Sequence, residues 1–185
     1  RFTLDDIPRM TTALDRSGWR HAQSLAAYSP VYHYMWNGLL AYWWMELAGA
    51  FCLFAQSPDG WFMPLPPFGA GSIDEPLCEA MGLLRRWNSD SPVSRVENVP
   101  SRLVPEFERL GYRLTSKEPD YLYCATDLEA LAGDRYRSQR ALCNRFEREQ
   151  PFEVSTYQVG DRQDCRALLA NWSRQKQAEG LEPFG

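Results

Sequence analysis

The sequence predicts an α/β (α+β) fold in which a central, mostly antiparallel mixed sheet is flanked by helices. The 185 residues are 44% hydrophobic and 24% charged, which is enough apolar material for the core of an ordinary domain and excludes a disordered tail. Aromatic residues reach 14%, which favours a well-packed interior. Segments typical of helices and of strands also alternate along the chain, separated by turns rich in Gly and Pro.

The first part of the chain is predicted to form helices followed by three antiparallel strands. The strand-like runs are poor in β-branched residues but rich in aromatic ones. Ser57-Pro58-Asp59-Gly60 predicts a turn, because Pro presets φ, Asp accepts local hydrogen bonds and Gly tolerates positive φ. The predicted elements are a helix at about 4–15, helical turns across 21–36, and strands at 41–47, 51–56 and 61–65.

Residues 38–55 have the hydrophobicity of a membrane segment, since their only charged residue is Glu46. A membrane-spanning helix needs roughly 20 mostly apolar residues. Gly49 interrupts this stretch between two aromatic runs, and no Lys or Arg occurs between Arg20 and Arg85 to provide a basic flank. We therefore predict a hairpin of two buried strands and no transmembrane segment.

Helices and short strands alternate in the rest of the chain. Ser72 and Glu75 have the spacing of a capping box, which predicts the start of a helix at 72–87, and Gly111 predicts the end of the next helix. The last helix has an apolar face that needs a packing partner, made by Cys165, Leu168, Leu169 and Trp172. The other predicted elements are strands at 94–98, 112–115, 121–125 and 152–157, and helices at 103–110, 138–150 and 161–179.

This order of elements resembles that of the GNAT acyltransferase fold, although a fold does not fix a function. The resemblance implies an N-terminal GNAT-like domain at 1–132, a basic linker helix at 133–150, and the start of a second, truncated GNAT-like domain at 151–185. The chain begins with Arg1 rather than Met, which is typical of a piece of a longer protein.

Composition excludes several classes of function. The chain carries 20 basic and 24 acidic residues, and its net charge of −4 argues against a general nucleic-acid coat. Its five cysteines form no C-x-x-C pair, which excludes a zinc knuckle and favours reduced thiols in a cytoplasmic protein. No metal-binding or P-loop motif occurs, so we predict no metal and no cofactor. His21 and His33 are the available near-neutral bases, and because neither lies in a catalytic motif we interpret both as interfacial or core residues.

The segment 66–71 occupies the position of the GNAT loop that holds the pyrophosphate of acetyl-CoA with backbone N–H groups at a helix N-terminus. It contains two glycines, but no Arg or Gln precedes them. Pro66 and Pro67 lack N–H donors, and Asp74 and Glu75 follow directly and would repel phosphate. We therefore predict a structural turn here, which weakens the alternative of a CoA-dependent N-acetyltransferase.

One segment is basic in an otherwise acidic chain. Residues 1–132 have a net charge of −5, whereas residues 133–150 carry five Arg against three acidic residues. The side chains that share one face of a helix here, opposite apolar residues, are Arg137, Arg140, Asn144 and Arg148. Guanidinium groups bind phosphate in a bidentate manner, so these four residues are the predicted anion- or substrate-binding site. Spacing alone leaves an alternative open, a solvated helix face paired with nearby Glu.

A set of motifs in the middle of the chain carries a family resemblance. It consists of Asp120-Tyr121-Leu122-Tyr123, Asp127-Leu128, Leu131, Gly133, Arg140 and Asn144-Arg145-Phe146. This signature resembles that of the domain of unknown function grouped with the C-terminal catalytic region of phosphatidylglycerol lysyltransferases. Residues 62–69 and the aromatic segment 32–36 also fit, so the resemblance spans roughly residues 4–175. Where the family usually has Lys-Arg-Asn, this chain has Gln139-Arg140-Ala141, which removes one basic group and one amide.

The resemblance implies a tandem pair of GNAT-like domains similar to the Fem-type transferases, which use aminoacyl-tRNA as the donor. Those enzymes transfer the aminoacyl group to an amine or, in lysyltransferases, to a lipid hydroxyl. The implied partners are aminoacyl-tRNA or an anionic lipid head group, bound through the basic helix of the full-length protein. Catalytic residues are expected beyond Gly185, and this chain alone is expected to be inactive. A non-catalytic GNAT-like binding or interaction domain is the main alternative.

Overall fold

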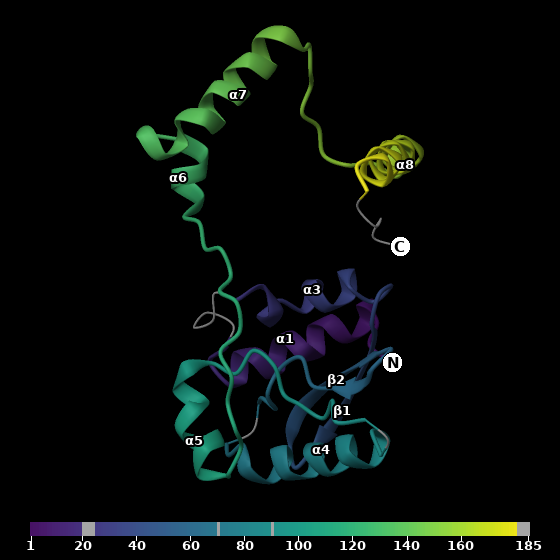
Figure 1. Cartoon of the computed structure of the whole chain (residues 1–185), viewed down its shortest axis with the longest axis vertical. Coiled ribbons are helices and arrows are strands. Elements are labelled where there is room, and N and C mark those ends of the chain that lie inside the picture. Colours follow the sequence, from purple (N-terminus) through teal and green to yellow (C-terminus); the bar gives the residue numbers. More distant parts are fainter. Residues whose placement is uncertain (20–24, 70, 90, 181–185) are drawn as a thin grey trace. The chain divides into compact units, whose positions relative to one another are not determined.

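The structure is a computed structural model that describes residues 1–19, 25–69, 71–89 and 91–180. It divides into two compact units, Arg1–Leu122 (unit 1) and Tyr123–Gly185 (unit 2). In unit 1, a three-stranded antiparallel sheet with the strand order β1-β2-β3 is flanked by helices (Figure 1). The mixed α/β class predicted from the sequence is therefore confirmed.

Unit 1 begins with helices and continues with an antiparallel meander. Its elements are η1 (Leu4–Asp6), α1 (Ile7–Arg16), η2 (Ala26–Tyr28), α3 (Pro30–Met35), β1 (Ala41–Leu47), β2 (Ala50–Ser57), β3 (Gly60–Phe62), α4 (Asp74–Trp87), η3 (Ser101–Leu103) and α5 (Val104–Arg109). The first helix, the three strands of the meander and the helix ending before Gly111 are confirmed. Of the helical turns predicted across 21–36, residues 21–24, with His21, lie outside the described residues, and η2 and α3 account for most of the rest.

β1 and β2 form the predicted hairpin. Their register pairs Trp44 with Leu53, and the connecting residues Ala48 and Gly49 both have positive φ, at 45° and 76°. A two-residue turn in which both residues have positive φ best matches the twist of the strands that it connects. Among the described residues, no helix is long and apolar enough to cross a membrane.

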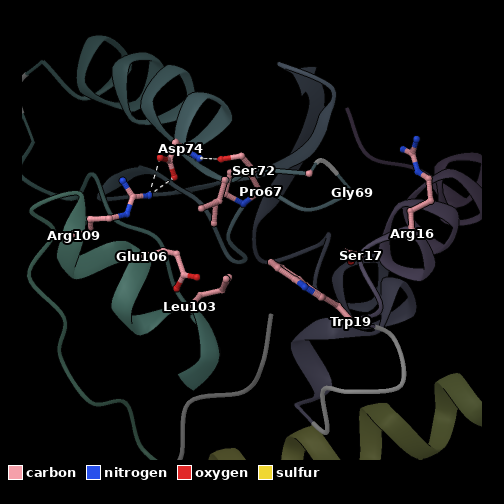
Figure 2. A pocket seen from close by; sticks show the side chains of 12 residues that line it. Arg16, Ser17, Trp19, Pro67, Gly69, Ser72, Asp74, Leu103, Glu106 and Arg109 are labelled. Carbon is pink, nitrogen blue, oxygen red and sulfur yellow. Dashed lines mark hydrogen bonds and ion pairs between the residues drawn. The ribbon is translucent and has the colours of Figure 1, made fainter.

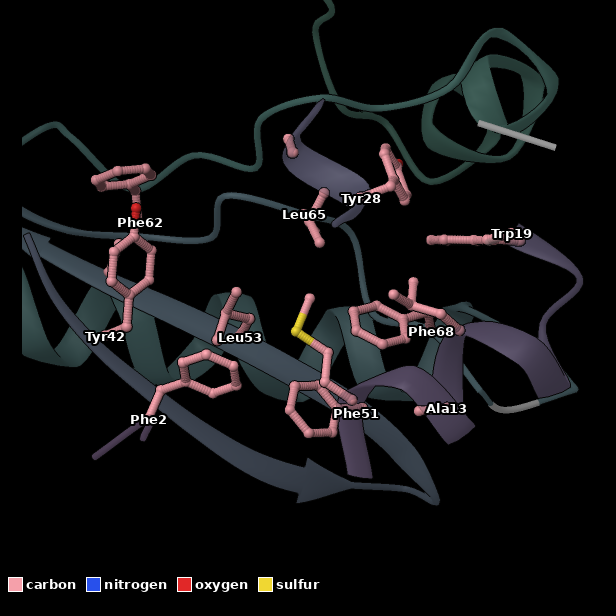
Figure 3. Close-up of a cluster of buried hydrophobic side chains, with 14 residues drawn as sticks. Phe2, Ala13, Trp19, Tyr28, Tyr42, Phe51, Leu53, Phe62, Leu65 and Phe68 are labelled. Carbon is pink, nitrogen blue, oxygen red and sulfur yellow. The ribbon is translucent and has the colours of Figure 1, made fainter. Parts of the chain in front are cut away.

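β2 is buried on both faces and separates two hydrophobic clusters. Phe51, Leu53 and Ala55 belong to the cluster drawn in Figure 3, whereas Cys52 and Phe54 belong to the other. Figure 1 shows α1 and α3 on one side of the sheet and α4 on the other, where α4 contacts all three strands. A strand covered on both faces needs a continuous apolar run, which explains the membrane-like hydrophobicity of this part of the sequence.

The strand predicted at 94–98 is reduced to one parallel bridge between Met63 and Val96. The Met63 N–H donates to the Arg95 carbonyl at 2.9 Å, and its carbonyl accepts from the Glu97 N–H at 2.8 Å. Asn98 then adopts a φ of 52°, which ends the extended chain. The pairing cannot lengthen because the backbone turns away there.

The capping box predicted from Ser72 and Glu75 is wrong. Helix α4 begins at Asp74, with Ile73 as the residue before its first turn. Ser72 is therefore one position too early to cap the helix, and its hydroxyl instead accepts a hydrogen bond from the Asp74 N–H at 3.3 Å. The helix itself is confirmed, because its apolar stripe packs into the second cluster.

The strands predicted at 112–115 and 121–125 do not form among the described residues. Tyr112 and Leu114 are partly buried against the second cluster, so the alternation of the first segment is real. Within the described part of the chain neither segment is assigned to a strand, and Tyr121 and Leu122 are exposed. An alternating pattern of apolar and polar residues indicates which side chains face the core. A strand also needs a neighbouring strand with which its backbone can pair.

Unit 2 is helical. Its elements are α6 (Ala125–Ala130), η4 (Asp134–Tyr136), α7 (Arg137–Glu149), η5 (Val159–Asp161) and α8 (Arg162–Ala178). The two long helices predicted at 138–150 and 161–179 are confirmed, whereas residues 152–157 are not a strand and leave Val154 exposed. The apolar face of α8 is also exposed at Leu168, Leu169 and Trp172. The assignment of GNAT-like domains to 1–132 and 151–185 stays a prediction.

Candidate functional site

Helix α7 carries the predicted anion-binding residues, and the helix forms as expected over Arg137–Glu149. Arg137 and Asn144 are exposed, and neither makes a side-chain hydrogen bond or ion pair with another described residue. The guanidinium of Arg137 lies in the first turn of the helix, where its donors remain available to an incoming anion. Arg137 and Asn144 are therefore the two predicted site residues whose side chains are not engaged by other described residues.

Arg140 is engaged by the protein itself. Its Nη1 donates to the carbonyl of Leu131, and also to the carbonyl of Gly133 at 3.2 Å. Leu131 is the residue after α6 and has the left-handed φ of 46°. The last carbonyl groups of a helix have no partner within it, so Arg140 stabilises the connection between α6 and α7. The same spacing that placed Arg140 on the predicted binding face thus gives it a structural contact.

Arg148 and its neighbour Arg145 form ion pairs with Glu149. The Arg148 Nη2 lies 3.0 Å from one Glu149 oxygen, and the Arg145 Nε lies 3.0 Å from the other. The side chains remain 70% exposed for Arg148 and 68% exposed for Arg145. These contacts are therefore weak and exchange readily with solvent. At this end of α7 the structure has the pairing with Glu that spacing left open as an alternative.

The opposite face of α7 is apolar. Phe146 and Phe152 lie with ring centroids 5.2 Å apart and, together with Leu142, border a surface hollow of about 660 Å³. All three side chains are more than half exposed. Helix α7 is therefore amphipathic, with guanidinium groups on one side and uncovered aromatic surface on the other.

The segment predicted as a structural turn lines the edge of a pocket in unit 1. The Phe68 N–H donates to the Phe51 carbonyl at 3.1 Å, and the Phe51 N–H donates back at 2.7 Å. The turn is therefore pinned to β2, and this amide is not available to a phosphate. Gly69 has a φ of 90° and lies so close to α1 that an added Cβ would approach the Ala13 carbonyl oxygen to 3.3 Å.

The pocket has a volume of about 420 Å³ and is shown in Figure 2. Its described lining residues are Arg16, Ser17, Trp19, Pro67, Gly69, Gly71, Ser72, Ile73, Asp74, Leu103, Glu106 and Arg109. Asp74 accepts two hydrogen bonds from the Arg109 Nη2, at 2.6 and 2.7 Å. Sequence reasoning considered the Gly/Pro segment and the acidic pair that follows it. It did not find the lining residues contributed by the end of α1, η3 and α5, because no spacing rule connects these elements.

His33 has no catalytic geometry. Its side chain is fully buried between the rings of Tyr32 and Tyr42, and its Nε2 donates to the Ala27 carbonyl at 2.7 Å. Burial lowers the pKa of His33 to about 4, so the imidazole is neutral at physiological pH. Its interpretation as a core histidine agrees with this position.

The cysteines and acidic residues likewise do not form a metal centre in the part of the chain that the structure describes. Cys52 is buried, and burial raises its pKa to about 12. Cys124 is exposed, and its pKa is lowered by a hydrogen bond from the Thr126 hydroxyl, whose oxygen is 3.0 Å from the sulfur, with help from the backbone amides that begin α6.

The chain is similar to a protein of known structure and matches a known family. It is similar to a conserved protein of unknown function from Bacteroides thetaiotaomicron, with a TM-score of 0.71 and 18% sequence identity. That similarity covers 97% of this chain and 60% of the Bacteroides protein, so the chain spans about three-fifths of its length. Because the sequence identity is low, this structural similarity shows a shared fold and nothing about function. Curated proteins provide no match.

The family is given by a second comparison. Residues 21–183 match the family described as phosphatidylglycerol lysyltransferase, C-terminal. This match includes unit 1 from position 21 onward and nearly all of unit 2, and with it the signature that includes Arg140. The chain therefore belongs to the phosphatidylglycerol lysyltransferase C-terminal family.

Proposed function

We propose that this chain is part of an enzyme that transfers an aminoacyl group from aminoacyl-tRNA to a lipid or amine acceptor. Membership in the lysyltransferase family carries the proposal, because it covers almost the whole chain. Under this proposal, residues 1–132 are an N-terminal GNAT-like domain and residues 151–185 begin a second one. The 185 residues alone are expected to bind a partner without turning it over.

Helix α7 provides the contact to that partner in this proposal. Both partner classes, tRNA and phosphatidylglycerol, present phosphate groups, and α7 concentrates guanidinium groups in a chain of net charge −4. Arg137 is central because its donors are not engaged by other described residues. Arg148 adds to it when its weak pair with Glu149 opens. Arg140 contributes indirectly by fixing where α7 begins.

A second candidate, a non-catalytic binding or interaction domain, is favoured by one observation. Two of the three arginines on the predicted face, Arg140 and Arg148, make contacts within the protein. When most of the arginines on a helix face already contact other groups of the same protein, that face is weak evidence for phosphate binding. The two candidates differ in whether a charged tRNA is consumed, and that difference can be measured.

The binding test compares Arg137→Gln with Arg166→Gln, which removes an exposed arginine from α8. Binding is measured to tRNA in one arm and, in the other, to vesicles of phosphatidylglycerol against vesicles of phosphatidylcholine. Loss of one phosphate contact in Arg137→Gln should reduce the slope of log K against log salt concentration by about 0.7–0.9. Arg166→Gln should leave that slope unchanged. Equal effects of both variants would show that the contribution of α7 is net charge alone.

The activity test uses aminoacyl-tRNA labelled in the amino acid, mixed with phosphatidylglycerol vesicles and the full-length protein. Label that moves into the lipid fraction supports transfer to a lipid, and label that moves to an added amine supports the other acceptor class. Binding of both partners with no loss of aminoacyl-tRNA would favour the non-catalytic domain. Transfer by the 185-residue chain alone would contradict the expectation that it only binds.

A further inference from the structure

We propose that the pocket of unit 1 binds a small amino compound, with Glu106 as the partner of its ammonium group and Trp19 as an aromatic wall. The pocket lies entirely within residues 16–109 and uses no residue of α7. Its volume of about 420 Å³ is within the range of small-molecule sites, which runs from about 300 to 1,000 Å³. The inference therefore does not depend on the anion binding that is proposed for α7.

Glu106 provides the first argument, because it leaves a carboxylate oxygen unsatisfied. Its Oε2 is buried and has no hydrogen-bond partner among the described residues. Arg109, one turn further along α5, does not serve as that partner, since its guanidinium is held by both oxygens of Asp74. A buried carboxylate oxygen without a donor is costly, and a ligand that brings N–H donors removes the cost.

Trp19 provides the second argument. Trp19 is only 6% exposed, packs against Phe68 with ring centroids 5.9 Å apart, and still lines the pocket. Figure 2 shows the Glu106 carboxylate and the Trp19 ring directed into the same space from different elements. The face of an indole attracts cations, and Arg102, which does not line the pocket, already lies over this ring at 4.7 Å.

The charges around the pocket define the ligand further. Four ionised side chains line it, and Asp74 and Arg109 neutralise each other. The remaining charges are the carboxylate of Glu106 and the guanidinium of Arg16, which is exposed and makes no ion pair with a described residue. Figure 2 places Arg16 at the far side of the pocket from Glu106. The complementary ligand carries an ammonium group for Glu106, and a carboxylate on the same ligand is favoured on the side of the pocket that Arg16 lines.

Three probes of equal chain length test this arrangement: 5-aminopentanoate, pentylamine and pentanoate. Binding to the purified chain is followed by NMR line broadening of the probe and by calorimetry at pH 7. We expect 5-aminopentanoate to bind best, pentylamine next and pentanoate least. Glu106→Gln should weaken the two amines about 10-fold or more, the size expected for one hydrogen bond to a charged group. Glu108→Gln, an exposed acid on the same helix, should change nothing.

Two further measurements separate a ligand site from a structural role. Arg16→Gln should weaken 5-aminopentanoate and leave pentylamine unchanged. Glu106→Gln should also raise the thermal midpoint of the free protein, because it removes the negative charge from a side chain whose Oε2 has no hydrogen-bond partner among the described residues. A lowered midpoint with unchanged probe binding would assign Glu106 to the fold and overturn the proposal. Pentanoate binding as tightly as pentylamine would overturn it as well, because the pocket would then not select a cation.

Discussion

The buried imidazole of His33 should make the stability of unit 1 depend on pH. The side chain is fully buried, and desolvation lowers its pKa from 6.5 to about 4. In the unfolded chain the imidazole takes up a proton near pH 6.5, whereas in the folded chain it stays neutral until about pH 4. The contribution of His33 to stability is therefore complete above pH 6.5 and is lost as the pH falls toward 4.

The size of this effect follows from the two pKa values. Their difference of about 2.5, at about 1.4 kcal/mol for each pH unit, corresponds to roughly 3 kcal/mol of unfolding free energy. The matched variant is His33→Gln, whose amide can still donate to the Ala27 carbonyl but does not titrate. Both proteins share the same carboxylates, so the difference between them isolates the imidazole.

Urea unfolding at a series of pH values measures that difference. The free energy of the wild type should fall by about 3 kcal/mol more than that of His33→Gln between pH 7 and pH 4. A His21→Gln background leaves a single imidazole, so that its NMR titration reports the folded pKa directly. The prediction would be refuted if the unfolding free energies of the wild type and of His33→Gln changed in parallel with pH. An NMR titration midpoint of His33 near pH 6.5 would refute it as well.

Three further predictions concern local contacts. Asn88→Ala should lower the unfolding free energy by about 2–4 kcal/mol in chemical denaturation, because Asn88 is buried and exchanges two hydrogen bonds, of 2.7 and 2.6 Å, with the backbone of Trp61. Ala48→Asn should raise it by about 0.5–1 kcal/mol, since Asn tolerates the positive φ of this turn better than Ala does. Iodoacetamide near pH 7.5 should alkylate Cys124 first of the five cysteines, as followed by mass spectrometry, and Thr126→Val should slow that reaction.

The sheet was predictable from the sequence because its signals are local. The Ser57-to-Gly60 turn, the glycine at position 49 and the aromatic runs that flank them fix the three strands to within a few residues. The strands predicted at 94–98, 112–115 and 121–125 failed because a strand is defined by its partner. Position 98 shows this limit, since its left-handed φ and not its composition ends the pairing with Met63.

The candidate sites show a similar limit. Helical spacing correctly places Arg137 and Arg140 on one face of α7, because that depends only on the geometry of one helix. The groups that each guanidinium contacts depend on the segment that connects α6 to α7. In that segment Leu131 has a left-handed φ, and its carbonyl accepts a hydrogen bond from Arg140. The pocket around Glu106 was even harder to predict from the sequence, since its charged residues come from three separate segments, at positions 16, 74 and 106–109.

Two arginines with the same sequence signal should therefore behave differently when they are replaced. Arg140→Ala removes the donor to the Leu131 and Gly133 carbonyls and should lower the stability of unit 2 by about 1–2 kcal/mol, seen as faster amide exchange in α6. Arg137→Ala removes no internal contact with a described residue and should leave amide exchange unchanged while weakening binding to anions. If Arg140→Ala instead weakened anion binding and left exchange in α6 as it was, the spacing argument would be right and the structural role of Arg140 wrong. The pair thus measures how much of the basic face is used for binding and how much holds α6 and α7 together.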